Sequence, residues 1–191
     1  MQALETAQHL TVEDYLAGEP DSAWRNEYLG GAVYAMAGAS EDHNVISLNL
    51  ASALRAHLRG KPCRVFIADV KVRLHIATAD IFYYPDVMVV CDPQDTDRLF
   101  KRRPRVLVEV FSPETERTDR REKFLNYTQI ESLEEYVLVA QDRMEVTLFC
   151  RANQWRSEVL RQESQSLRLA SLEFALPLSA VYEAVILPAG G

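Results

Sequence analysis

The sequence is poor in cysteine and has no long apolar run. Its three cysteines, Cys63, Cys91 and Cys150, lie far apart without Cys-x-x-Cys spacing. Their number is odd and two of them fall in apolar strand patterns, so we expect buried, reduced thiols. The densest apolar runs, 87–91 and 106–108, are far shorter than the roughly 18 residues of a membrane span. Because no export signal opens the chain, we expect a cytoplasmic protein without membrane contact.

Positive charge is also in short supply. Lys and Arg number 21 against 28 Asp and Glu, which gives a net charge of −7. This balance does not favour the broad basic surface of most duplex-binding proteins. The basic residues nevertheless form two clusters, which flank the apolar run containing Glu109: Arg98, Lys101, Arg102, Arg103 and Arg105 before it, and Arg117, Arg120, Arg121 and Lys123 after it. A basic rim around an acidic site and ordinary solvated charge are both consistent with this pattern.

Several catalytic signatures are missing. The chain has no Gly-x-Ser-x-Gly nucleophile elbow, no Gly-x-x-x-x-Gly-Lys phosphate loop, no Gly-x-Gly-x-x-Gly turn and no His-Glu-x-x-His pair. These absences exclude the common serine hydrolase, P-loop, dinucleotide-binding and zinc-protease sites.

The first half of the chain predicts two capped helices, a hairpin and a long strand. A capping box at 11–14 predicts a short helix ending at Gly18, and Gly30-Gly31 predicts a hairpin between 27–29 and 32–36. Ser40 is a good N-cap for a helix that ends at Gly60. Strict alternation over 65–76 predicts one half-buried strand.

The second half predicts a sheet with further helices. Residues 86–91 and 105–111 are continuous apolar runs, typical of strands covered on both faces, and an amphipathic helix is expected over 119–130. Strands are then expected at 135–140, 144–150, 155–160 and 167–169, followed by a helix at 178–185. We therefore predict one α/β domain over 1–191, a mixed sheet flanked by helices with an N-terminal hairpin and a C-terminal antiparallel meander.

Two carboxylates carry the chemical argument. Glu109 interrupts an apolar strand, and Asp86 opens the preceding one. A buried, ionised carboxylate costs several kcal/mol unless it is paired or binds metal. If the two strands are neighbours, both carboxylates converge, and two oxygen donors suit Mg²⁺ or Mn²⁺. The alternative is a buried salt bridge to Lys71, Arg73 or Lys123.

Other polar residues can support this pair. Asp119, Lys123 and Tyr127 share one helical stripe that can face Glu109, and a lysine there would orient a water and neutralise charge on a phosphate. Lys123 can equally form an ordinary intrahelical pair with Asp119. His43, in a first helical turn, and Glu27, before the hairpin, are further candidates for the site.

An ordered set of motifs resembles the PD-(D/E)XK nuclease superfamily, and more narrowly its bacterial Uma family of endonucleases. The motifs span most of the chain: Tyr84-Pro85-Asp86-Val87, then Val108-Glu109-Val110-Phe111-Ser112-Pro113-Glu114-Thr115, then Asp119-Arg120 to Lys123 and Tyr127. Glu27 with Gly30-Gly31, Ala37-Gly38 before His43-Asn44, and 132–136 add to them.

The resemblance implies a restriction-endonuclease-like core in which carboxylates of two neighbouring strands hold Mg²⁺ for phosphodiester hydrolysis. Asp86 takes the PD position and Glu109 the (D/E) position. Phe111 stands where the motif has lysine, and the resemblance implies that Lys123 supplies the amine from the following helix, with Lys71 as the fallback. It also implies association as a homodimer.

The sequence therefore predicts a metal-dependent endonuclease acting on nucleic acid, with DNA favoured over RNA. In this hypothesis Asp86 and Glu109 bind Mg²⁺ (or Mn²⁺) and Lys123 completes the catalytic set. The nucleic-acid backbone is expected to contact Arg102, Arg103, Arg120 and Arg121. The competing hypothesis is a non-catalytic nucleic-acid-binding or regulatory module on a degenerate nuclease fold, which the missing motif lysine and the negative net charge favour.

Overall fold

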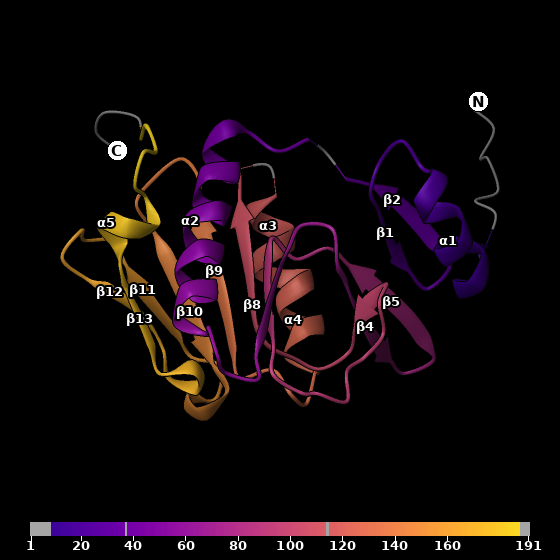
Figure 1. The fold of residues 1–191 in the computed structure, drawn as a ribbon. Coiled ribbons are helices and arrows are strands. Elements are labelled where there is room, and N and C mark those ends of the chain that lie inside the picture. Colours follow the sequence, from indigo (N-terminus) through magenta and orange to yellow (C-terminus); the bar gives the residue numbers. More distant parts are fainter. Residues whose placement is uncertain (1–8, 37, 114, 188–191) are drawn as a thin grey trace.

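The computed structural model describes residues 9–36, 38–113 and 115–187. It contains a six-stranded sheet of order β11-β10-β9-β8-β6-β3, a five-stranded sheet of order β2-β1-β5-β4-β7 and a two-stranded ribbon of β12 and β13 (Figure 1). Within the described part of the chain, no helix is long and apolar enough to cross a membrane. The mixed α/β class predicted from the sequence is confirmed.

The six-stranded sheet forms the centre of the molecule. Only β8 and β9 pair in parallel, and the other neighbours are antiparallel. All six residues of β9 and all but one of β8 are buried, as expected for apolar runs covered on both faces. The strands are β3 (Arg64–Ile67), β6 (Val87–Val90), β8 (Pro104–Phe111), β9 (Glu135–Ala140), β10 (Val146–Cys150) and β11 (Ser157–Leu160).

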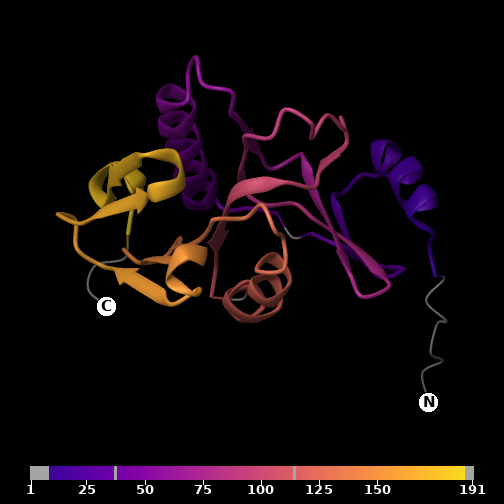
Figure 2. The ribbon, with the colours of Figure 1, turned by 90° about the horizontal axis from the view of Figure 1, so that it is seen from below.

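One face of this sheet is covered by α2 (Glu41–His57) and the C-terminal elements (Figures 1 and 2). Ser40 caps the helix by accepting a hydrogen bond from the His43 amide (3.1 Å), and Ile46, Leu50 and Leu54 are fully buried. The C-terminal elements are β12 (Ser166–Leu169), β13 (Phe174–Pro177) and α5 (Leu178–Val181). The closing helix is thus shorter than the predicted 178–185, and β13 was not predicted.

The opposite face is covered by three short consecutive helical turns. They are α3 (Glu116–Thr118), the π-helical turn η2 (Asp119–Lys123) and α4 (Phe124–Tyr127). The helix predicted over about 119–130 is therefore present, but it spans 116–127 and its middle turn is π-helical rather than α-helical. Tyr127, Ile130 and Leu133 pack here against the face of the sheet that includes Leu107 and Phe111.

The five-stranded sheet carries the N-terminal hairpin. The Gly30-Gly31 turn joins β1 to β2 as predicted, with both glycines at positive φ. Thr11 caps α1 as predicted, and α1 packs on this sheet through Tyr15. The elements are α1 (Val12–Gly18), η1 (Glu19–Asp21), β1 (Asn26–Leu29), β2 (Ala32–Ala35), β4 (Lys71–Ile76), β5 (Ala79–Tyr83) and β7 (Phe100–Lys101).

The strand predicted over 65–76 is wrong, because the chain changes sheets in its middle. Ala68 adopts a left-handed φ of 47°, and its amide donates to the Asp86 carbonyl (3.2 Å). β3 before this point joins the six-stranded sheet, and β4 after it joins the five-stranded sheet. In β4 the alternation matches burial, since Val72 and Leu74 are buried, whereas β3 has no buried residue and Ile67 is exposed. The apolar alternation in the sequence runs through both pieces, so the pattern alone hides the break.

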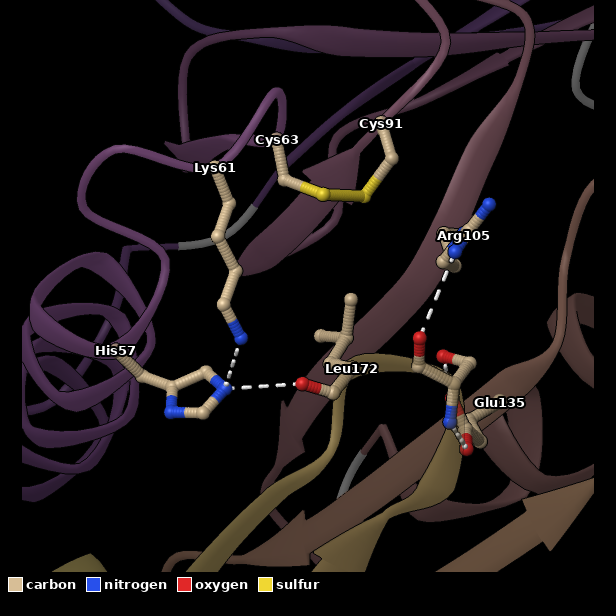
Figure 3. Close-up of a disulfide and its surroundings, with 8 residues drawn as sticks. His57, Lys61, Cys63, Cys91, Arg105, Glu135 and Leu172 are labelled. Carbon is tan, nitrogen blue, oxygen red and sulfur yellow. Dashed lines mark hydrogen bonds between the residues drawn. A yellow bond between two sulfur atoms is a disulfide. The ribbon is translucent and has the colours of Figure 1, made fainter.

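The prediction of reduced thiols at Cys63 and Cys91 is also wrong, because the structure joins them in a disulfide (Figure 3). β3 pairs with β6 so that Arg64 lies opposite Val90, and the next pair outward is Cys63 with Cys91, whose Cα atoms are 4.0 Å apart. Cys150 is not in a disulfide. Disulfides persist mainly in oxidising compartments, so this one does not support the cytoplasmic expectation.

Candidate active site

Asp86 and Glu109 are brought together by the pairing of β6 with β8. Val87 lies opposite Val108, so the next pair places Asp86 beside Glu109 on the same face of the sheet. Asp86 is further fixed across the strands, because its Oδ2 accepts a hydrogen bond from the Val110 amide (2.7 Å). The adjacency on which the sequence argument depended is therefore present.

His43 approaches Asp86 from the N-terminus of α2. Its Nε2 lies 3.1 Å from Asp86 Oδ1, so the two oxygens of Asp86 have different partners. The start of this helix is held at the same end of the sheet, since the Ser40 hydroxyl donates to Gln141 Oε1 (2.9 Å) just beyond β9. Packing of α2 on the sheet thus fixes the imidazole beside Asp86.

Lys123 reaches the site from η2, which covers the face of the sheet opposite α2. Its Nζ lies 3.3 Å from Glu109 Oε1, 3.4 Å from Asp119 Oδ1 and 3.2 Å from Glu27 Oε1. One turn later, the Tyr127 hydroxyl donates to the same oxygen of Glu109 (2.7 Å). Of the predicted residues, the structure therefore brings together Asp86, Glu109, Lys123, His43, Glu27, Asp119 and Tyr127.

The centre of this cluster is buried, and its edge is partly open. The exposed side-chain fractions are 4% for Glu109 and 8% for Lys123, but 13% for Asp86 and 19% for His43. Solvent therefore reaches the cluster at Asp86 and His43, and also at Glu27, whose side chain is 16% exposed.

The charges of the cluster do not balance. Three carboxylates are ion-paired with the single ammonium group of Lys123, and Asp86 adds a fourth negative charge nearby. Burial raises the pKa of Glu109 well above its ordinary value, an effect that Lys123 opposes and that Asp86 and Asp119 reinforce. Burial alone would lower the pKa of Lys123, but Glu109, Glu27 and Asp119 together raise it well above its ordinary value. Lys123 therefore stays charged.

The donor set fits a hard divalent cation. Asp86 and Glu109 supply carboxylate oxygens, and Glu27 Oε1 is buried without a hydrogen bond, although it lies within ion-pair distance of Lys123. No group of three His, Cys, Asp or Glu side chains is arranged as a ready metal cage among the described residues. Mg²⁺ does not need one, because it is usually held by one or two carboxylates, with waters and substrate phosphates as the other ligands.

Three supporting residues were not found from the sequence. The Tyr136 hydroxyl donates to the Asp119 carbonyl (3.0 Å), and Asn126 Nδ2 donates to the Tyr83 hydroxyl (2.7 Å). The Tyr83 ring centroid lies 5.6 Å from Lys123 Nζ. Tyr83 and Tyr136 were detectable as polar-tipped aromatics within apolar strands, but Asn126 gives no such signal.

The predicted backbone-contacting arginines do not gather at one point. Arg102 and Arg103 lie before β8, at the end of the strand remote from Glu109, where they line a cavity of about 640 Å³. Arg121 is exposed, whereas Arg120 is ion-paired with Glu116 (2.7 Å) and Glu145 (2.6 Å).

The fallback lysine is engaged elsewhere. Lys71 Nζ lies 3.6 Å from Glu19 Oε2 and is stacked over the Tyr84 ring. Of the two lysines considered for the amine, only Lys123 is paired with Glu109.

Comparison with known proteins agrees with this fold. Two uncharacterized proteins of Synechocystis sp. are similar: one is 34% identical over 175 residues, covering 91% of each chain, and the other is 33% identical over 144 residues, covering 74% of this chain and 80% of its own. A crystal structure of a "putative nuclease belonging to DUF820" from Anabaena variabilis superimposes with a TM-score of 0.75. Its sequence identity is 16%, and the match covers 93% of this chain and 99% of that one, so it shows a shared fold.

The family assignment rests on most of the chain. Residues 12–179 match the family described as "Uma2: Putative restriction endonuclease". This range includes Glu27, His43, Asp86, Glu109 and Lys123. The match supports a nuclease with a restriction-endonuclease-like fold, and the chain belongs to the Uma2 family.

Proposed function

We propose that this protein is a metal-dependent endonuclease that hydrolyses phosphodiester bonds of nucleic acid, DNA in preference to RNA. The observation that carries the proposal is the convergence of Asp86, Glu109 and Lys123 at one partly open end of the neighbouring strands β6 and β8. Family membership supports it, since the family is described by a nuclease activity.

Asp86 and Glu109 would hold Mg²⁺ or Mn²⁺. A bound divalent ion polarises the scissile phosphate and lowers the pKa of a coordinated water. The surplus of carboxylates gives this site its affinity for a cation, because an added positive charge relieves the repulsion among them. Tyr127 keeps one oxygen of Glu109 in place, and the Val110 amide does the same for Asp86.

Lys123 positions the attacking water and stabilises negative charge on the phosphate. Its ammonium group is held at three points by Glu109, Asp119 and Glu27, so it enters the reaction already oriented. His43 orients Asp86 at the solvent-facing side and can donate to a phosphate oxygen there. The exposed Arg102 and Arg121 contact the backbone further from the centre. We also propose a homodimer, as the family resemblance implies.

A second candidate is a non-catalytic nucleic-acid-binding or regulatory module. Phe111, which is fully buried, stands at the motif lysine position, and Lys123 is itself surrounded by three carboxylates. In that case the cluster is a buried ion-pair network, the alternative that the sequence left open for Glu109.

The deciding experiment compares the wild-type protein with Glu109→Gln. Supercoiled plasmid and single-stranded oligonucleotides are incubated with each protein in Mg²⁺, Mn²⁺ or EDTA. We expect metal-dependent cleavage by the wild type and a loss of at least about 10³-fold in the variant, with a similar circular dichroism spectrum. Glu145→Gln is the matched control, because Glu145 is also a buried glutamate but lies outside the site. Cleavage that survives in Glu109→Gln removes this residue from the mechanism, and folded protein that binds but never cleaves supports the second candidate.

A further inference from the structure

A second cavity lies next to the candidate active site. It has a volume of about 400 Å³, within the range of roughly 300–1,000 Å³ of small-ligand sites. Its lining includes Glu19, Ser22, Trp24, Arg25, Met36 and Tyr84.

Residues that line this cavity lie close in sequence to residues of the active-site cluster. Arg25 precedes Glu27 by two residues, and Tyr84 precedes Asp86 by two. The turn at Ala68, next to the lining residue Asp69, donates its amide to the Asp86 carbonyl (3.2 Å). The cavity is therefore within reach of a molecule whose phosphate is bound at Asp86.

Trp24 is the unusual feature of the lining. Its side chain is 68% exposed, although burial of an aromatic of this size is normally favourable. The turn that presents it is well held, since the Ser22 hydroxyl (2.7 Å) and Asn26 Nδ2 (2.9 Å) both donate to the Trp24 carbonyl. An exposed indole on a hydrogen-bonded turn is available for stacking on a planar ring.

Polar groups complete the lining. Arg25 donates to the Ala68 carbonyl (3.1 Å) and lies 3.5 Å from Asp69, whose side chain is 86% exposed. The Arg25 side chain is itself 38% exposed. The cavity therefore offers an aromatic face together with both donors and acceptors, the combination that binds the edge and the face of a nucleobase.

We propose that this cavity receives an unpaired nucleobase next to the scissile phosphate, stacked on Trp24. The inference rests on the proposed function and specifies its substrate: single-stranded nucleic acid, or a duplex with a base that is unpaired or turned out of the stack. A paired base cannot enter, because its edge and both of its faces are already covered in the duplex.

Trp24 fluorescence gives a direct test, since the chain has only two tryptophans. In a Trp155→Phe background, Trp24 is the only tryptophan reporter. It is titrated in EDTA with a single-stranded DNA 12-mer, the blunt duplex of the same sequence and that duplex with one bulged base. We expect quenching by the single strand and the bulged duplex, with at least several-fold weaker quenching by the blunt duplex.

Substitutions then test the stacking itself. Trp24→Ala should weaken single-strand binding by roughly 5- to 150-fold, measured by anisotropy of a labelled 12-mer, while Trp24→Phe should retain most of the affinity. Ile186→Ala removes an apolar side chain that is 85% exposed elsewhere and should change nothing. Unchanged affinity in Trp24→Ala, or equal quenching by all three probes, overturns the proposal.

The two proposals fail separately. If cleavage requires metal and is lost in Glu109→Gln, but Trp24 is not quenched, then the nuclease proposal stands and the base-site proposal is contradicted. If the single strand quenches Trp24 but no metal supports cleavage, then the base-site proposal stands and the nuclease proposal is contradicted.

Discussion

Two buried glutamates have opposite electrostatic surroundings. Glu145, just before β10, is 6% exposed and is ion-paired with three arginines: Arg120 (2.6 Å), Arg143 (3.3 Å) and Arg161 (2.9 Å). Glu109, in β8, is 3% exposed and shares one lysine with two other carboxylates. Burial would raise both pKa values, but the Arg161 and Arg143 contacts lower that of Glu145, while that of Glu109 stays raised.

We infer that this difference separates a structural cluster, at Glu145, from the proposed functional one, at Glu109. The three arginines that contact Glu145 are balanced by Glu145, Glu116 and Asp142, so this cluster is charge-neutral and holds neighbouring elements together. Around Glu109 the carboxylates outnumber the single lysine, and in the proposed function a bound cation would offset their repulsion. Arg120 and Lys123, three residues apart in η2, contribute to the two clusters respectively, and π-helical turns are frequent at functional sites.

The contrast between the Glu109 and Glu145 clusters predicts that Lys123→Met strongly lowers both cleavage and stability. Removing the ammonium group should reduce cleavage by about 10²–10³-fold. It should also lower the free energy of unfolding by about 3–5 kcal/mol, since the carboxylates lose their cation. Urea unfolding and plasmid cleavage measure the two effects. Adding Glu109→Gln should recover part of the stability and none of the cleavage, and a Lys123→Met variant that cleaves normally would contradict a catalytic role for the lysine.

Removing the disulfide should lower the stability of the protein without changing its activity. It closes a separation of 28 residues, so the Cys63→Ser/Cys91→Ser variant should lose about 2–4 kcal/mol in free energy of unfolding. Because the disulfide lies at the end of β6 remote from Asp86, cleavage below the unfolding temperature should be unchanged. This variant is the stability-matched control for Lys123→Met. A drop in its cleavage while it is folded would show that the disulfide also positions Asp86.

The contribution of Glu145 to the free energy of unfolding should disappear at low pH. Its pKa is lowered in the folded state, so its stabilisation is complete above the unfolded value of about 4.3 and is lost as pH falls through the folded value. At pH 7, Glu145→Gln should lose about 1–3 kcal/mol. We expect this difference from the wild type to shrink towards zero when urea unfolding is repeated at pH 5, 4 and 3. A difference that is constant with pH would show that the charge of Glu145 is not what stabilises the fold.

Local patterns predicted much of the scaffold. The apolar runs gave β6 and β8 nearly to the residue, and β9 has the predicted bounds. Thr11 and Ser40 marked the starts of α1 and α2, since capping depends on neighbouring residues alone. Once β6 and β8 are neighbours, the meeting of Asp86 and Glu109 follows from their positions in the two strands.

Features that depend on distant contacts were not predictable. The turn at Ala68 occupies a left-handed conformation without glycine or asparagine to signal it, and the Asp86 carbonyl holds it from 18 residues away in sequence. The disulfide depends on the register of β3 with β6. The Glu145 cluster collects arginines from three separate segments, so Arg120 looked as available for a nucleic-acid backbone as its neighbour Arg121.

The smallest predicted effect compares two buried tyrosines, one beside each glutamate. The Tyr127 hydroxyl donates to the Glu109 carboxylate (2.7 Å), whereas the Tyr182 hydroxyl bonds the backbone of Glu145 and Ala140 (3.0 Å each). Tyr127→Phe should raise the Mg²⁺ concentration needed for half-maximal cleavage by roughly 10- to 100-fold, because Glu109 loses the donor that orients it. Tyr182→Phe should lower the free energy of unfolding by about 1 kcal/mol and leave that concentration unchanged. If both variants shift the Mg²⁺ requirement equally, the two glutamates are not functionally distinct, since a general loosening of the core would then explain the effect at Tyr127.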